Sequence, residues 1–550
     1  MAFALSFLVL TLWSYLYVTK QEQMVSSKDT IHEEEKGSIP ESTKTQITTT
    51  LVPPVSEVET GIQAIPQIKE KEILIETPLY SAIFSNEGAT IKSFKLNNYR
   101  VTKDPDSPTV ELINLKDDDK NSFSISFDNK STPEDKKIFY SASEESIAIT
   151  DESAPKDLTF KYLRSDGVEI DQTYRFYPDR YDIEIFITIA NYSESQSEGN
   201  ISVYLKNLPS QKKNYSYSFS GIALLLDDKL NEIKQKKMKE DKFLSGRIGW
   251  VAYENDYFIS AIIPEDQKEG SFIGRLLPSG IIEAIYVAPL ISIKPFGKGS
   301  AGFTLYMGPR DLDILKKLGK KLDQAIHFGF FDIIAKPLYF LLRYFNRLVH
   351  NYGLSIIILT VLIKIIFWPL THKSFKSMKE MQKLQPLMAK IREKYKDDKE
   401  QMQRELMGLY KTYKVNPMGG CLPILIQIPV FLALYRILGN SIELRQAPFI
   451  LWITDLSAPD RLLNFPFSIP FMSPPYGIPV LTLLMGASMF VQQKMTPTSG
   501  DPAQAKVMMF LPLIFTVMFI NLPSGLVLYW LTNNILSVGQ QYHMKKRPSQ

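Results

Sequence analysis

The hydrophobic and polar positions divide this chain of 550 residues into a polar first half and an apolar second half. Residues 20–320 are rich in charged and polar side chains, whereas most of residues 352–541 are apolar. In the polar half, apolar residues alternate with polar or smaller ones at Ile183, Ile185, Ile187 and Ile189, and again at Ile201, Val203 and Leu205. This period of two predicts strands with one buried face.

Turn sequences separate these strands at residues 86–88, 178–180 and 264–266. Many short strands with frequent turns are typical of a sandwich, so we predict an all-β sandwich domain over residues 66–322. Its abundant carboxylates form no convergent catalytic group and are expected to be a solvated face. Residues 20–65 have no sustained apolar period and are dominated by Ser, Thr, Glu, Lys and Pro, which predicts a flexible tether.

The apolar half predicts a multi-span α-helical membrane protein. Its apolar runs lie at residues 352–370, 421–438, 476–493, 507–521 and 524–541. The first of these is long enough to cross a bilayer, and together they predict a five-span core over residues 352–541. A further run at residues 2–18 lacks the basic start and the small-x-small site of a cleaved signal peptide, so we predict an N-terminal anchor over residues 1–19.

Residues 325–350 are apolar and aromatic, with Lys336, Arg343 and Arg347 interspersed. This composition predicts an amphipathic helix lying in the membrane interface. A core helix of the β domain would show the same pattern. Pro337 argues against one straight helix.

Residues 372–417 carry twelve Lys and Arg against six Asp and Glu. Apolar residues at helical spacing on both sides of Asp397-Asp398 predict an antiparallel helical hairpin, with Asp398 capping the second helix. Positive loops stay in the cytoplasm, which places this hairpin there. Its basic residues include Lys383, Lys390, Arg392 and Arg404.

Four predicted spans separate the hairpin from the basic tail at residues 542–550, and four is an even number. Hairpin and tail therefore lie on the same, cytoplasmic side, and the β domain lies outside. With the anchor retained, the N-terminus is also cytoplasmic. The loop at residues 440–475 has only Arg445 and Arg461 as positive charges, which fits the outer face.

The rarer residues exclude several kinds of site. The single cysteine, Cys421, excludes an internal disulfide framework, and five scattered histidines make a structural zinc site an unexpected feature. The chain contains no Walker loop, nucleophile elbow or dinucleotide fingerprint. We therefore expect no catalytic residue, metal or cofactor, and no recognition of a specific nucleic-acid sequence.

Polar residues within the predicted spans lie at similar depth. Lys364 lies about five residues from the cytoplasmic end of its span, roughly 7–8 Å at 1.5 Å per residue. Gln427 lies roughly 9 Å deep and Asn533 and Asn534 roughly 10–12 Å deep, with Thr360 somewhat deeper. Such groups normally face one another or water, which predicts a hydrated pocket open to the cytoplasm. Alternatively, Lys364 snorkels to the headgroups, and the amides only join helices.

Long stretches of the second half are similar to a known family. They are PLT at residues 369–371, KVNPMGGCLPILIQIPVFLALYRIL at 414–438, ELRQAPFILWITDLSA at 443–458 and LPSGLVLYWLTNN at 522–534. Over residues 325–541 the chain resembles the YidC-type membrane protein insertases of Gram-negative bacteria, relatives of the Oxa and Alb insertases. The resemblance implies five core spans around a groove open to cytoplasm and lipid, and a β-sandwich domain in the periplasm.

The resemblance also assigns roles to single residues. The groove charge is usually arginine, and Lys364 occupies that position here. Thr360, Gln427 and Asn534 match groove-side or substrate-facing positions, and Tyr529 and Trp530 match an aromatic pair. Asn533 is a further polar candidate beside Asn534. For recruitment of a ribosome or nascent chain by the basic hairpin, the candidates are Lys383, Lys390, Arg392 and Arg404. For the apolar surface along which an incoming helix slides, the candidates are Ile424, Phe431, Met508 and Phe515.

These observations predict an inner-membrane insertase and chaperone that is not an enzyme, because no bond is made. Its expected partners are nascent membrane proteins, the ribosome, the Sec translocon and membrane lipid. One alternative is a secondary transporter using Lys364, although the spans show no internal repeat. Another is an enzyme or sugar-binding protein whose active part is the β domain.

Overall fold

The computed structural model describes residues 69–115, 122–128, 138–209, 219–238, 240–266, 268–415, 422–496 and 502–546. The predicted anchor at residues 1–19 and the tether at residues 20–65 lie outside the described residues. The same holds for the end of the basic tail, residues 547–550. Everything described below belongs to the compact unit Glu70–Gln550.

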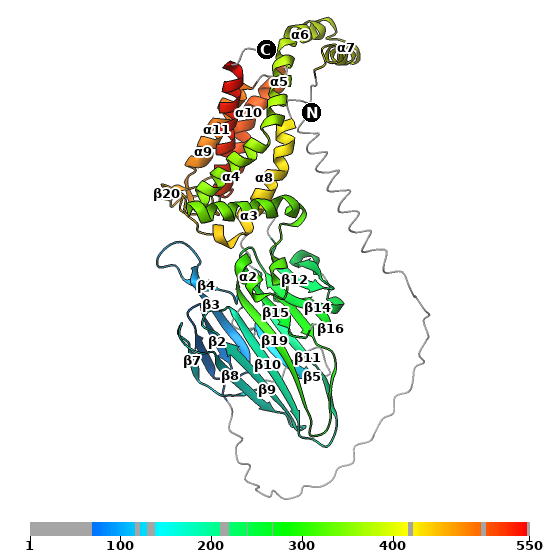
Figure 1. Cartoon of the computed structure of the whole chain (residues 1–550), viewed down its shortest axis with the longest axis vertical. Coiled ribbons are helices and arrows are strands. Elements are labelled where there is room, and N and C mark those ends of the chain that lie inside the picture. The colour runs from blue at the N-terminus through cyan, green and yellow to red at the C-terminus, as the bar shows by residue number, and fades with distance from the viewer. Residues whose placement is uncertain are drawn as a thin grey trace, which may run out of the picture. The chain divides into compact units, whose positions relative to one another are not determined.

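The polar half folds into two sheets that share one long strand, β14 (Lys242–Glu254) (Figure 1). The other strands of the first sheet, in spatial order, are β7 (Ser146–Ala148), β1 (Glu72–Glu76), β2 (Tyr80–Ser85), β3 (Thr90–Arg100), β5 (Phe123–Asp128), β11 (Ser197–Asn207), β17 (Ile282–Val287) and β16 (Glu269–Leu276). Two short strands extend it, β4 (Thr109–Glu111) beside β3 and β18 (Ile291–Ile293) beside β11.

The second sheet consists of β6 (Ser141–Ala142), β8 (Lys156–Leu163), β9 (Val168–Phe176), β10 (Asp182–Asn191), β19 (Lys298–Pro309), β15 (Phe258–Pro264), the end of β14, β12 (Gly221–Leu226) and β13 (Lys229–Lys234). Residues 242–247 of β14 pair with β16 of the first sheet, and residues 251–254 pair with β15 of the second. The β-sandwich predicted from the sequence is thereby confirmed.

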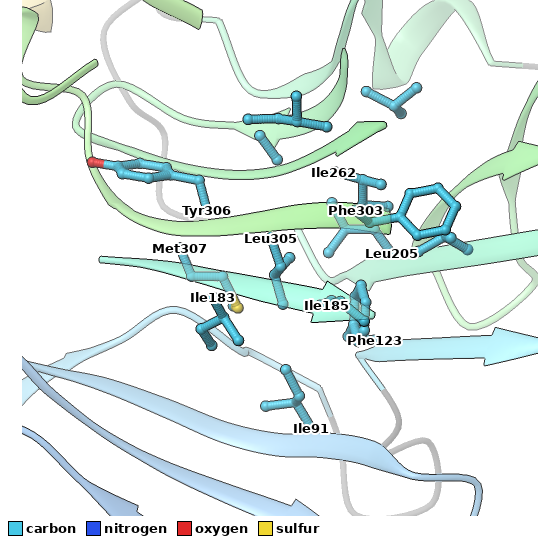
Figure 2. Packing of buried hydrophobic residues seen from close by; sticks show 14 of the residues in the cluster. Ile91, Phe123, Ile183, Ile185, Leu205, Ile262, Phe303, Leu305, Tyr306 and Met307 are labelled. Carbon is cyan, nitrogen blue, oxygen red and sulfur yellow. The ribbon is translucent and has the colours of Figure 1, made fainter. Parts of the chain in front are cut away.

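The sandwich core is made of the residues that alternate along the strands. All four predicted isoleucines of β10 and the three predicted residues of β11 are at most 2 % exposed. In β10, Ile183 is paired with Leu305 and Ile185 with Phe303 of β19, and Figure 2 shows these side chains together in the core. Burial of this set stabilises the domain at about 25 cal/mol per Å² of apolar surface.

The domain also contains a short helix, α2 (Leu312–Leu318), which the all-β prediction omits. Local signals define it: the carboxylate of Asp311 accepts hydrogen bonds from the first-turn amides, and Gly319 with φ 77° ends the helix. The alternating apolar pattern of the neighbouring strands led to an all-β prediction. The helix is nevertheless specified locally by its two capping residues.

The predicted amphipathic helix is shorter than residues 325–350. Two 3₁₀ turns, η3 (Leu322–Ala325) and η4 (Gly329–Phe331), precede α3 (Asp332–Val349). The segment is not one straight helix, as expected from the sequence, but the interruption lies before α3, and Pro337 lies inside that helix. Proline removes one backbone hydrogen bond, but burial of Tyr339 and Leu342 against the neighbouring helices holds α3 together.

The second half is helical. Its α-helices are α4 (Tyr352–Ile366), α5 (Trp368–Lys383), α6 (Gln385–Lys394), α7 (Lys399–Thr412), α8 (Leu422–Asn440), α9 (Val480–Met495), α10 (Pro502–Phe519) and α11 (Ser524–Lys546). Helix α11 packs against α4, α8 and α9, α10 packs against α9, and α3 contacts α4 and α8. Between α8 and α9 the chain forms η6 (Ile442–Leu444) and a ribbon of β20 (Leu462–Phe465) and β21 (Tyr476–Ile478).

Within the described part of the chain, no single helix is both long and apolar enough to cross a membrane. Helices α4 and α5 meet that test as a pair, with a bend of 62° between them, and Leu425–Asn440 and Met508–Phe519 are shorter apolar helices. Helix α4 ends at Ile366, whereas the predicted apolar run continues to residue 370, within α5. Pro369 explains the bend, because it lacks an N–H and belongs to the first turn of α5.

Candidate functional site

Lys364 of α4 points at the central helix α11. Its ammonium nitrogen Nζ donates a hydrogen bond to the hydroxyl of Ser537 over 2.6 Å. That hydroxyl in turn donates to the backbone carbonyl of Asn533, one turn earlier, over 2.7 Å. The charge is thus held between helices. Sequence reasoning missed Ser537, although it lies four residues after Asn533 and so shares its helix face.

Two further polar contacts reach α11 from other helices. The amide nitrogen of Asn534 donates to the hydroxyl of Ser488 on α9 over 3.0 Å. The amide nitrogen of Gln427 on α8 lies 3.5 Å from the hydroxyl of Tyr529, at the long limit for a hydrogen bond. Side chains from α4, α8 and α9 therefore all meet polar groups of α11.

Thr360 does not join this group through its hydroxyl. The hydroxyl donates to the carbonyl of Ile356 in the preceding turn of α4 over 2.6 Å, and the side chain is buried. Such local bonding satisfies a threonine within its own helix. Lys364 and Thr360 share a helix face as predicted, but the hydrogen-bond partner of Lys364 is Ser537.

An aromatic cluster adjoins the polar residues. The ring of Trp530 lies 4.9 Å from Phe431, 5.0 Å from Phe519 and 6.0 Å from Phe515, measured between centroids. Helices α8, α10 and α11 contribute these rings. Phe431 and Phe515 are both candidates for the apolar surface along which an incoming helix slides, and both pack against Trp530. Phe519 packs there as well, although it was not predicted from the sequence.

The structure says less about the other two candidates for this apolar surface, Met508 and Ile424. Met508 is half-buried near the start of α10, and the side chain of Ile424 lies outside the described residues. Helix α10 instead exposes large apolar side chains along one face, including Phe510 and Leu513, each 63 % exposed. An exposed apolar face of this kind marks contact with lipid or with another protein.

The four recruitment candidates lie on the charged helices α5, α6 and α7. Lys383 pairs with Glu380 at 2.9 Å, and Arg404 pairs with Glu400 at 2.6 Å. Lys390 is exposed and Arg392 is half-buried. Asp398 accepts a hydrogen bond from the amide of Gln401 over 2.9 Å and caps α7, as the sequence predicts.

Comparison with known proteins identifies the family. A family model described as the 60Kd inner membrane protein matches residues 344–550, and one described as the YidC periplasmic domain matches residues 72–341. The membrane protein insertase YidC of Syntrophus aciditrophicus is 43% identical over 507 residues, covering 90% of each chain. The chain belongs to the YidC family of membrane protein insertases. The resemblance seen in the sequence is confirmed.

A second YidC relative agrees with this assignment. The insertase YidC of Syntrophobacter fumaroxidans is 41% identical over 478 residues, or 86% of each chain. A crystal structure of an active YidC insertase with its first transmembrane domain resolved is 21% identical, covering 86% of this chain and 93% of that chain, with a TM-score of 0.38.

Proposed function

We propose that this YidC-family chain inserts nascent proteins into the inner membrane and assists their folding. The observation that carries the proposal is the convergence of Lys364, Gln427 and Ser488 on polar residues of α11 within the helical bundle. Polar groups placed among apolar helices are costly, so they are kept for a function. The function that they suit is temporary contact with the polar segment of a membrane protein in transit.

The proposed membrane arrangement places α4, α8, α9, α10 and α11 as five spans. It is supported by the exposed apolar side chains of α9 and α10, among them Leu483, Leu484, Phe510 and Leu513. Helix α3, with Phe340, Tyr344 and Leu348 exposed, lies in the interface. The charged helices α6 and α7 and both termini are then cytoplasmic, and the β-sandwich is periplasmic.

The proposed mechanism requires no covalent chemistry, so the chain is not an enzyme. A ribosome-bound nascent chain first meets the basic hairpin, and its polar segment then enters beside Lys364. The polar groups shorten the apolar distance which that segment has to cross. The apolar segment passes the aromatic cluster into lipid, and its burial drives insertion at about 25 cal/mol per Å². The same steps are compatible with the Sec translocon as a partner.

Site-specific photo-crosslinking tests the proposal. A crosslinking residue is placed at Gln427, Trp530 or Ser488, and at the exposed Leu484 of α9 as the matched control. Each variant is mixed with ribosomes carrying a stalled nascent membrane protein. We expect adducts from the first three positions as the polar segment enters, and weak or later adducts from position 484. Equal labelling from all four positions would contradict a specific polar path.

A further inference from the structure

Three ligand-bearing side chains meet in the β domain where it leads into α3. Glu232 of β13 and Glu254 of β14 approach His327, which lies between η3 and η4. Their ligand atoms all lie within 4.8 Å of one another. The imidazole Nε2 is 3.2 Å from an oxygen of Glu232 and 3.7 Å from Oε1 of Glu254.

The strand register brings the two carboxylates together. Strands β13 and β14 flank β12 on opposite sides, with Glu232 paired to Ala223 and Glu254 paired to Gly221. Positions two apart on a strand share a face, so both carboxylates reach over the smallest residues of β12. The cluster is therefore built by the fold and is not a chance encounter of mobile surface side chains.

Glu254 is the unusual member. Its side chain is fully buried, and no described residue donates a hydrogen bond of acceptable geometry to either carboxylate oxygen. A buried carboxylate normally has several donors, because its desolvation costs several kcal/mol. Its nearest cations are His327 on Oε1 and the Nε of Arg310, 3.7 Å from Oε2. The carboxylate is thus poised between two positive groups without a close bond to either.

We propose that Glu232, Glu254 and His327 bind a divalent transition-metal ion of the zinc class. Ligands held about 2.0–2.2 Å from a tetrahedral ion stand roughly 3.4 Å apart, and the two distances from Nε2 fall on either side of that value. Imidazole nitrogen and carboxylate oxygen are both ligand types that zinc accepts, and three protein ligands leave a fourth position for water.

Arg310 places a positive charge beside the buried carboxylate of Glu254, in the position where metal-bound carboxylates usually have a supporting partner. Its guanidinium donates to the carbonyl of Asn255 over 2.6 Å and to that of Ala325 over 2.5 Å. It is held beside Oε2 of Glu254, which leaves Oε1 free to face the ion. Glu232 is the solvent-exposed member of the cluster and also borders a surface hollow.

In the described structure the imidazole of His327 faces both carboxylates, with Nε2 3.2 Å from Glu232 and 3.7 Å from Glu254. Binding of the ion would replace these two contacts by coordination bonds. The ion would fix the segment before α3 to the β domain.

The test uses Co²⁺ as a spectroscopic probe and the full-length chain, purified in detergent and stripped with a chelator. We expect one Co²⁺ per chain, with the intense visible absorption of a four-coordinate site, and its displacement by one equivalent of Zn²⁺. His327→Gln should abolish this spectrum, and Glu254→Gln should weaken Zn²⁺ binding at least tenfold. Arg310→Lys should weaken it by about 10–100-fold. His372→Gln, a distant exposed histidine, is the matched control and should change nothing.

Two outcomes would overturn the inference. One is weak, non-stoichiometric binding with a six-coordinate spectrum, which would mean an adventitious ion only. The other is unchanged binding in His327→Gln and Glu254→Gln. The spectrum of the unaltered chain decides the matter even if a variant fails to fold. The crosslinking experiment on the helical bundle has an independent result, so failure of either idea is recognised separately.

Discussion

The ammonium group of Lys364 donates a hydrogen bond to the hydroxyl of Ser537, and this contact joins α4 to the central helix α11. A lysine that only snorkelled would extend toward the end of its own helix. Here the charge is instead directed across the bundle. The relationship fixes Lys364 beside Ser537, whose hydroxyl bonds the carbonyl of Asn533, and it makes the role of that charge open to experiment.

Lys364 is predicted to act through its charge. A charge pair at 4 Å is worth about 4 kcal/mol at an effective dielectric near 20 and about 1 kcal/mol in water, and a partly hydrated groove lies between these limits. Lys364→Arg should retain function, whereas Lys364→Ala should impair substrates with acidic translocated segments most. The measurement is insertion of paired substrates differing only in those acids. Equal insertion of both substrates by Lys364→Ala would refute the electrostatic role.

Ser537 is predicted to position that charge. A hydrogen bond to a charged group contributes about 1.5–3 kcal/mol, so Ser537→Ala should lower insertion of the acidic substrate several-fold. Ser537→Thr, which keeps the hydroxyl, should restore it. Thr360→Val is the matched control, because the hydroxyl of Thr360 bonds only within its own helix. If Thr360→Val reduces insertion of the acidic substrate more than Ser537→Ala does, then Ser537 is not the residue that positions the charge.

Helix α9 is predicted to need glycine at position 486. A Cβ atom there would overlap the side chain of Thr516 on α10. Overpacking of this kind destabilises a protein by about 1–3 kcal/mol, so Gly486→Ala should lower the midpoint of thermal unfolding in detergent. Gly539→Ala on α11 is the control, since no described atom lies within 4 Å of its added carbon. That change should stabilise α11 by about 0.5–1 kcal/mol; a similar shift in both variants would argue against close α9–α10 packing.

The β domain is predicted to be dispensable for insertion, because every polar contact with α11 described above comes from α4, α8 or α9. Residues 70–309 are removed, and insertion is assayed in cells depleted of their own insertase. The expected result is substantial residual insertion, with the truncated chain present at normal levels. Complete loss of insertion at normal accumulation would show that the β domain takes part in the transfer itself.

Helices α6 and α7 are predicted to recruit the ribosome or nascent chain and not to form the path. They pack on each other through Met388, Leu406 and Leu409. This cluster is separate from the polar contacts of α11. Removing residues 385–412 should slow insertion while leaving the unfolding midpoint of the bundle nearly unchanged. Charge reversal at Lys390 and Arg392 gives a milder test of the same idea. Unaltered insertion kinetics in both variants would exclude a recruiting role.

The sequence by itself determined the features that depend on local pattern. Alternating isoleucines in β10 specified a buried strand face, because side chains two apart lie on one side of a sheet. Asp398 specified a helix start, because its carboxylate satisfies a free amide of the first turn. Contiguous stretches such as residues 414–438 were enough to indicate the YidC family, since a family signature needs no tertiary contact.

Only the tertiary structure decided which side chains meet. Helix rotation and rotamers directed Lys364 to Ser537 and left Thr360 bonded to its own turn. Pro337 by itself argued against a straight helix, because proline lacks an N–H. Packing against neighbouring helices nevertheless allows the proline inside α3. Glu254 and His327 are separated by five strands, β15 to β19, and by helix α2, and they meet only through sheet register and the path of the chain after β19. Contacts across such sequence distances depend on the fold as a whole, which no local pattern specifies.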